Sequence, residues 1–172
     1  MTVASEILFA WNALEPEAAA TEILPCCGSI RWANELVQTR PVGDEMELFE
    51  CSDAIWRALS PADWDEAFRS HPKIGESKAE TTTPQSAAWS RDEQEGLATS
   101  GVDIRSAIRE ANRTYELRFG RIYIVCAAAR SAEEMLADLE RRLQNDAEKE
   151  LLEAVEQQRQ ITQLRLRKWL KL

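Results

Sequence analysis

The sequence predicts an all-α protein, a compact single-domain bundle of about eight or nine helices over residues 1–172. The chain is rich in Ala, Glu, Leu and Arg and holds 6 glycines and 6 prolines, a composition that favours helices over sheets. Helix start and stop signals recur along it, whereas one run alone, Ile122 to Cys126, has a strand-like composition. A lone strand would have no partner, so we interpret this run as a buried helical turn or an extended connector.

Apolar residues at helical spacing predict five helices before residue 71. The expected ranges run from Ser5 to Leu14, Pro16 to Pro25, Ser29 to Pro41, Asp44 to Leu59 and Pro61 to about Ser70. Pro16 suits the first helical position, and Pro25 is expected to stop the same helix. His71 precedes Pro72, and a residue before proline avoids the helical region, so the fifth helix is expected to end there.

Four more helices are predicted after an irregular stretch over residues 72–88. Their expected ranges are 90–101, 103–119, 131–144 and 145 to near the C-terminus. The pattern Ser90-Arg91-Asp92-Glu93 is typical of a capping box, in which the serine and the glutamate satisfy each other's backbone N–H groups. Gly120 is the expected C-terminal stop of the helix before it.

The charge and the cysteine pattern argue against nucleic-acid binding, membrane binding and a structural zinc site. A formal net charge of −9 argues against nucleic acid or a membrane as a partner. No apolar run approaches the roughly 20 residues that span a bilayer, and no export signal is recognisable, so we expect a cytoplasmic protein with reduced thiols. The four cysteines form no Cys-x-x-Cys motif and no Cys/His cluster, which argues against a structural zinc site.

Four segments contain residue types that could carry chemistry, and the first holds the single histidine, His71. An imidazole changes charge near neutral pH without special tuning. Pro72 would hold it stiffly at the mouth of the irregular stretch. From spacing alone, a surface histidine at a helix end is the more common case, and both interpretations stay open.

The other three segments also allow two interpretations each. Ser90 to Gln94 can simply cap a helix, or its N–H groups can bind an anion while Glu93 exchanges a proton with a ligand. The run from Phe119 to Cys126 can be core, or it can present backbone groups to a flat heterocycle. Arg165 can be a surface arginine whose stem covers apolar neighbours, or a clamp for a carboxylate.

Six motifs in register cover nearly the whole chain and resemble the OHCU decarboxylase family, where OHCU is 2-oxo-4-hydroxy-4-carboxy-5-ureidoimidazoline. They are Cys26-Cys27-Gly28-Ser29, Phe68-x-x-His71-Pro72-Lys73-Ile74-Gly75-Glu76, Trp89-Ser90-Arg91-x-Glu93-Gln94-x-Gly96, Asn112-x-x-Tyr115-x-x-Arg118-Phe119-Gly120-x-Ile122-Tyr123-Ile124-Val125-Cys126-Ala127, Arg130-Ser131-Ala132-Glu133-Glu134-Met135-Leu136 and Ile161-Thr162-x-Leu164-Arg165-Leu166. The chain departs from the family pattern at Arg121 and over residues 127–130.

The resemblance implies a helical bundle, often a homodimer, that uses no metal and no organic cofactor. It also implies the last step of urate oxidation in purine catabolism, in which OHCU loses CO₂ and protonation on one face gives (S)-allantoin. The family's catalytic histidine and glutamate fall on His71 and Glu93. The residues implied in substrate binding are Pro72, Ser90, Arg91, Asp92, Gln94, Arg121, Ile122, Tyr123, Ile124, Val125 and Arg165.

Two other functions stay open at this point. A non-catalytic helical module that binds a purine-derived anion or a protein partner would use the same pocket, but it would not need both His71 and Glu93. A hydrolase acting on an earlier intermediate of the pathway is disfavoured, because no nucleophile–base pair or metal site is visible in the sequence.

Overall fold

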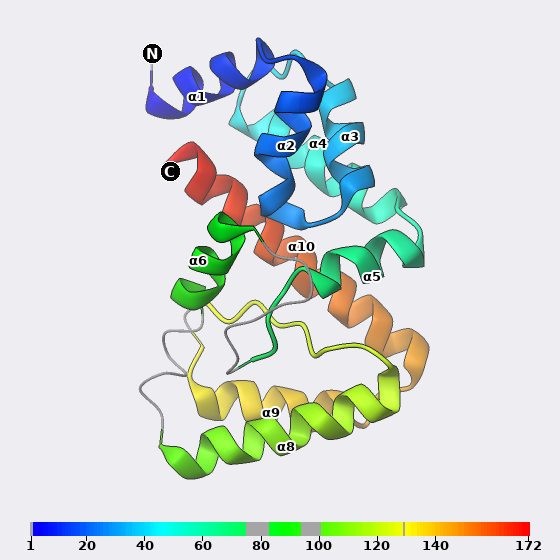
Figure 1. Cartoon of the computed structure of the whole chain (residues 1–172). Helices are drawn as coiled ribbons and strands as arrows, with labels where there is room; N and C mark the ends of the chain where they lie inside the picture. The colour runs from blue at the N-terminus through cyan, green and yellow to red at the C-terminus, as the bar shows by residue number, and fades with distance from the viewer. Residues whose placement is uncertain (1, 75–82, 94–100, 129) are drawn as a thin grey trace. The chain divides into compact units, whose positions relative to one another are not determined.

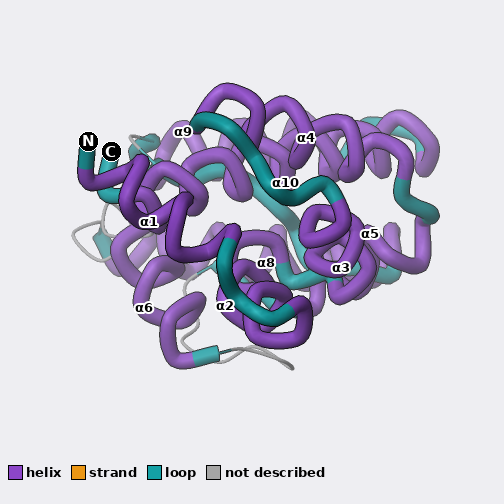
Figure 2. The backbone as a smooth tube through the Cα atoms, turned by 90° about the horizontal axis from the view of Figure 1, so that it is seen from above, coloured by secondary structure: helices purple, strands orange, loops and turns teal. Residues whose placement is uncertain are grey.

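The computed structural model describes residues 2–74, 83–93, 101–128 and 130–172, and within them it contains α-helices and no strand (Figures 1 and 2). This confirms the predicted all-α fold. None of the described helices has the length and apolar character needed to cross a membrane. The helices are α1 (Val3–Asn12), α2 (Pro16–Cys27), α3 (Ile30–Gln38), α4 (Glu45–Ala58), α5 (Pro61–Arg69), α6 (Pro84–Glu93), α8 (Val102–Phe119), α9 (Ala132–Arg142) and α10 (Ala147–Leu170).

Backbone packing divides the chain into two compact units. The first comprises Met1–Ala67 together with Arg159–Leu172, and the second comprises Phe68–Gln158. The helices α5 and α10 each contribute residues to both units. A single domain over residues 1–172 stays a prediction.

Buried tryptophans form the centre of the first unit. Trp11 and Trp32 are completely buried, and a buried indole N–H needs an acceptor. Trp11 Nε1 donates to the carbonyl of Ala19 at 3.0 Å, which ties α1 to α2. Trp32 Nε1 donates to the carbonyl of Ser52 at 3.3 Å, which ties α3 to α4. The buried tryptophans therefore join consecutive helices of this unit through their indole N–H groups.

Pro25 does not end α2, so that prediction was wrong. The helix continues to Cys27, and Gly28 ends it with a left-handed φ of 91° and an N–H donated to the carbonyl of Leu24. Proline removes one helical hydrogen bond, but Pro25 lies in the last turn, where it and both following cysteines are buried. Burial of these side chains offsets the single lost bond, and glycine rather than proline sets the helix end.

The helix predicted to begin at Ser90 begins earlier, at Pro84. Thr83 Oγ1 accepts the N–H of Ser86 at 3.1 Å, and Pro84 takes the first helical position. Ser90 lies inside α6 and is 3% exposed, so it cannot cap this helix. The capping box predicted over Ser90–Glu93 was wrong because a capping serine must precede the first helical residue.

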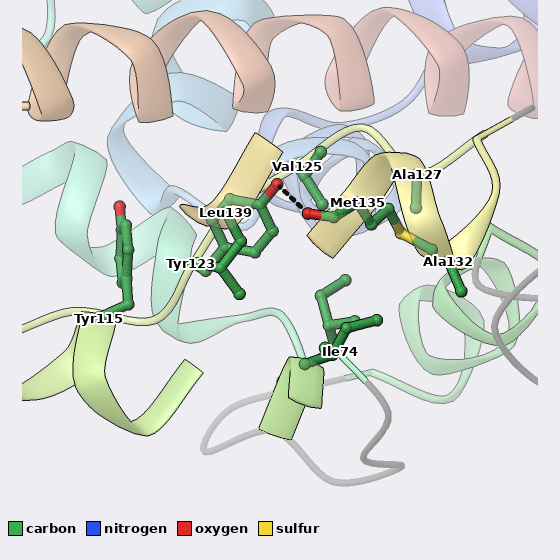
Figure 3. Close-up of a cluster of buried hydrophobic side chains, with 9 residues drawn as sticks. Ile74, Tyr115, Tyr123, Val125, Ala127, Ala132, Met135 and Leu139 are labelled. Carbon is green, nitrogen blue, oxygen red and sulfur yellow. Dashed lines mark hydrogen bonds between the residues drawn. The ribbon is translucent and has the colours of Figure 1, made fainter. Parts of the chain in front are cut away.

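The second unit contains an apolar cluster between α8, α9 and the connector that joins them (Figure 3). The helices α8 and α9 lie side by side (Figure 1). The rings of Tyr115 and Tyr123 meet edge to face, with centroids 5.6 Å apart. The run Ile122 to Cys126 is neither helix nor strand, which confirms the extended-connector interpretation. The buried members of the cluster are Ile74, Ile108, Tyr115, Tyr123, Val125, Ala127, Ala132, Met135 and Leu139.

Candidate active site

His71 follows the end of α5 by two residues, and hydrogen bonds fix both its backbone and its ring. Its N–H donates to the carbonyl of Phe68 at 3.1 Å. Its imidazole Nε2 lies 2.7 Å from Oε1 of Gln158 on α10. His71 is 8% exposed and Gln158 is completely buried. The alternative of a surface histidine at a helix end is therefore wrong, and the imidazole has the fixed position that acid–base chemistry needs.

The two residues after Pro72 attach this turn to the rest of the second unit. Lys73 Nζ donates to Glu116 Oε2 on α8 at 2.8 Å. Ile74 belongs to the apolar cluster and lies among its labelled side chains in Figure 3. Pro72 itself is half-buried. A charge pair and apolar contacts thus hold the chain directly after the histidine.

The residues predicted on α6 have different environments. Ser90 is buried, whereas Arg91 and Asp92 are exposed. Glu93 is the last residue of α6, and the predicted roles of its side chain and of Gln94 lie outside what the structure describes. A ligand contact by any of these residues stays a prediction.

The connector after α8 carries the third predicted segment. Gly120 ends α8 with a φ of 68° and donates its N–H to the carbonyl of Glu116 at 2.9 Å. Isoleucine and valine favour extended backbone, and the chain after Gly120 forms a bend at Arg121 and is then neither helix nor strand up to Ala127. Arg121 and Ile122 are half-buried, while the next three residues, Tyr123, Ile124 and Val125, are buried.

A buried polar network holds the middle of this connector. Arg142 Nη1 donates to the carbonyl of Ile124 at 2.6 Å, and Arg142 Nε donates to Glu150 Oε1 at 2.8 Å. The hydroxyl of Tyr115 donates to the same carboxylate oxygen, and Asn145 Nδ2 donates to the other at 2.9 Å. Buried charges are tolerated when their hydrogen bonds are satisfied. The carbonyl of Ile124 is therefore bound by the protein itself.

The two tyrosine hydroxyls and the Arg142 guanidinium at this connector keep their protons around neutral pH. Burial raises the pKa of the Tyr115 hydroxyl, and so does its hydrogen bond to Glu150. Burial also raises the pKa of Tyr123, whose hydroxyl donates to Asp138 Oδ2 at 2.6 Å. For Arg142, burial is the largest single effect and lowers the pKa, but the hydrogen bond to Glu150 and the charges around the guanidinium together outweigh it, and the pKa is raised overall. Both phenols therefore remain donors, and the guanidinium remains charged.

Two successive glutamines of α10 connect the histidine turn with the connector. Gln157 Oε1 accepts the backbone N–H of Cys126 at 3.0 Å. Gln158, the next residue, is the partner of His71 at 2.7 Å. All four residues belong to the second unit. This unit thus brings together His71 and the segment from Arg121 to Val125, two of the four segments that the sequence singles out.

Arg165 lies on the part of α10 that belongs to the first unit. It is completely buried, and its Nη1 donates to the carbonyl of Pro25 at 3.4 Å. The interpretation as a surface arginine is therefore wrong. Its role as a carboxylate clamp stays a prediction.

Sequence reasoning missed Gln158, Arg142 and Glu150. Gln158 occupies an inward position of α10, four residues after the buried Ala154, and a polar residue in an apolar stripe needs a partner. The sequence therefore indicates that Gln158 needs a buried partner, but it does not indicate that this partner is His71. Arg142 in a last helical turn and Glu150 in a first turn are the usual charges at helix ends, so nothing in the sequence indicates their burial.

Comparison with known proteins decides the family. The family described as OHCU decarboxylase matches residues 12–167. The chain belongs to the OHCU decarboxylase family. It is 33% identical over 144 residues to the uric acid degradation bifunctional protein TTL of Arabidopsis thaliana, an alignment that covers 83% of this chain and 44% of the longer plant protein. It is 26% identical over 127 residues to the OHCU decarboxylase of Amia calva, covering 74% of this chain and 73% of that one.

Two solved structures share the fold of this chain. A crystal structure of OHCU decarboxylase in the presence of (S)-allantoin matches with a TM-score of 0.75 and 31% identity, covering 92% of this chain and all of the other. A crystal structure of (S)-allantoin synthase matches with a TM-score of 0.71 at 17% identity, covering 94% of this chain and 53% of that one. The second likeness concerns the fold alone.

Proposed function

We propose that this member of the OHCU decarboxylase family converts OHCU to (S)-allantoin and CO₂, the last step of urate oxidation. The observation that carries the proposal is the buried imidazole of His71, held by Gln158 at 2.7 Å. The family match over residues 12–167 supports it. So does the 31%-identical relative whose crystal structure was determined in the presence of (S)-allantoin.

The reaction needs a positioned acid and a site closed to water. The bond to the carboxylate breaks, CO₂ leaves, and the electron pair moves into the imidazoline ring. One proton then adds to one face of a ring carbon and sets the handedness of allantoin. We assign the delivery of this proton to His71, because an imidazole can give and take a proton at neutral pH. Burial of the imidazole disfavours proton delivery by water, which would reach both faces.

The remaining site assignments come from the resemblance. Glu93 is the second acid–base residue in this proposal, and Arg165 binds the substrate carboxylate, for which a guanidinium offers two parallel hydrogen bonds. The other proposed substrate contacts are Pro72, Ser90, Arg91, Asp92, Gln94, Arg121, Ile122, Tyr123, Ile124 and Val125. No metal and no organic cofactor takes part in the proposal.

Assembly and location are also proposals. The resemblance supports a homodimer, which sedimentation of the purified chain tests directly. The four cysteines, which form no Cys-x-x-Cys motif and are expected to be reduced, support a cytoplasmic protein. A fluorescent fusion found in another compartment would contradict that location.

The test of the activity is the handedness of allantoin formed from freshly generated OHCU. We expect the protein to accelerate CO₂ release and to give (S)-allantoin, followed by circular dichroism. His71→Asn is expected to lower the rate by about 10²- to 10⁴-fold, the usual contribution of a positioned acid or base. Arg113→Ala, on an exposed side chain of α8, is the matched control and is expected to keep the full rate.

Racemic allantoin formed at the spontaneous rate with the wild-type protein would rule out the decarboxylase. A fully active His71→Asn variant would remove His71 from the mechanism while leaving the activity in place. If OHCU binds without turnover, and both variants bind it as the wild type does, the chain is the non-catalytic module instead.

A further inference from the structure

The hydrogen bond between His71 and Gln158 joins residues 87 positions apart in the chain. The atoms are imidazole Nε2 and amide Oε1, 2.7 Å apart. Both side chains belong to the second unit, and Gln158 is completely buried. A hydrogen bond of this length between two buried groups fixes the ring, because neither group can exchange its partner for bulk water without breaking the packing.

The chemistry of this contact decides which ring nitrogen carries the hydrogen. An amide oxygen has lone pairs and no hydrogen, so it can only accept. The imidazole Nε2 must therefore carry the proton that is donated. A neutral ring that holds its hydrogen on Nε2 has its lone pair on Nδ1, and protonation at Nδ1 produces the imidazolium.

We propose that Gln158 is a positioning residue that fixes the tautomer and orientation of His71, so that Nδ1 is the nitrogen that gives and takes the proton in the decarboxylation. This inference rests on the proposed function. Gln158 touches no reacting atom in this scheme. It acts through the imidazole, by accepting from Nε2 in both the neutral and the charged form of the ring.

The surrounding contacts suit this role. The backbone N–H of His71 donates to the carbonyl of Phe68 at 3.1 Å, so the ring extends from a turn whose backbone is held in place. Two residues further on, Lys73 is paired with Glu116 at 2.8 Å. Gln157 binds the connector through Cys126 instead of the histidine, which makes it a control of the same residue type on the same helix.

Nitrogen-15 NMR of histidine-labelled protein tests the inference, because His71 is the only histidine in the chain and both ring signals must come from it. In the neutral wild-type ring we expect a protonated Nε2 and an unprotonated Nδ1. In Gln158→Met, which keeps the length of the side chain without the amide oxygen, we expect a mixture of the two tautomers. Gln157→Met is expected to keep the wild-type histidine signals.

A glutamate at the same position should restore the acceptor. Gln158→Glu is expected to keep the hydrogen on Nε2 and to raise the pKa of His71, because a carboxylate stabilises the imidazolium. Gln158→Met is expected to lower that pKa, since the charged ring loses an acceptor. The Lys73–Glu116 pair is unchanged in all these variants, so it cannot account for opposite shifts.

Activity measurements separate positioning from general damage to the fold. We expect Gln158→Met to lower kcat by roughly 10- to 100-fold, below the full contribution of a positioned acid or base, with little change in KM. Gln158→Glu should recover much of kcat, with the alkaline limb of its pH profile, where the proton-donating imidazolium is lost, moved to higher pH. A merely structural role would not predict opposite movements of the pH profile in two variants with the same thermal stability.

Two results would overturn the inference. One is a wild-type ring with its hydrogen on Nδ1, which would mean that the amide presents its NH₂ group to Nε2. The other is an unchanged tautomer and pKa in Gln158→Met. Both are read without substrate, so they are independent of the OHCU assay. If the NMR results are as expected but the protein does not turn over OHCU, the proposed function is contradicted and the assignment of the His71 tautomer is not.

Discussion

Arg141 and Arg142 are neighbours at the end of α9, yet their side chains are 53% and 1% exposed. Arg141 pairs with Asp138 and Glu153 at the surface. Arg142 pairs with the fully buried Glu150 and binds the connector. The same residue type thus has two roles one position apart, because consecutive helix positions point in different directions.

This pair of arginines gives a matched prediction. Arg142→Met should lower the free energy of unfolding by about 3–5 kcal/mol, since it leaves a buried carboxylate without its counter-charge. Arg141→Met should cost about 1 kcal/mol or less, as exposed ion pairs usually do. Urea unfolding of both variants beside the wild type measures the difference. Equal losses in the two variants would mean that the buried pair contributes no more than the surface one.

Among the elements, α8 and the connector are joined by a single glycine whose backbone is left-handed. Gly120 has a φ of 68°, and a Cβ added there would have no heavy atom within 4 Å beyond its chain neighbours. Space is therefore not the reason for glycine at this position. The reason is backbone strain, because a side chain in the left-handed region costs roughly 1–2 kcal/mol.

Substitution at Gly120 tests whether this turn sets the connector. Gly120→Ala is expected to lower stability by about 1–2 kcal/mol. Gly120→Asn should cost less, because asparagine tolerates left-handed backbone at helix ends. Thermal unfolding ranks the two variants. A larger loss for asparagine than for alanine would point to its bulk and not to backbone strain.

The sequence predicts a helix start well when the residues that cause it lie within a few positions of that start. The cap of α9 is a reciprocal contact between Ser131 and Glu134, three residues apart, and the sequence predicted that this helix begins at residue 131. The Ser90–Glu93 pattern has the same spacing, but Thr83 and Pro84 start that helix first. A capping pattern therefore predicts a helix start only where no earlier start signal competes.

In the candidate site, too, residues recognisable from their own motif could be predicted, whereas contacts between distant parts of the chain could not. His71 could be predicted from its own residue type and motif. Its partner Gln158 could not, because a contact across 87 positions depends on how the second unit folds in three dimensions. The same holds for Arg142, whose acceptor is a backbone carbonyl and so has no sequence signature at all.

For the molecule as a whole, buried thiols link stability to alkaline pH. Cys26 and Cys27 are completely buried on α2. Burial raises the pKa of the Cys27 thiol from 9.0 to about 12, against the lowering effect of its hydrogen bond with Ser29. Burial raises the pKa of Cys26 as well, although the charge of Arg165 opposes it. Both thiols therefore stay protonated in the folded protein where they would ionise in the unfolded chain.

The sign of the pH effect follows from proton counting. Above pH 9 the unfolded chain loses the Cys27 proton while the folded protein keeps it up to about pH 12. The unfolded state then binds fewer protons, so the free energy of unfolding falls as pH rises, by about 1.4 kcal/mol per pH unit for each such thiol. Below pH 9 both states hold the proton and this dependence disappears.

We expect Cys27→Ala to make this alkaline loss shallower by the contribution of one thiol, and Cys26→Ala/Cys27→Ala to make it shallower still. Urea unfolding at pH 8, 9.5 and 10.5 measures the slopes. Tyr115 and Tyr123, whose pKa values burial also raises, act in all three proteins and cancel in the comparison. Identical slopes in wild type and both variants would mean that the thiols ionise equally in the folded and unfolded chain, which is incompatible with their burial in the first unit.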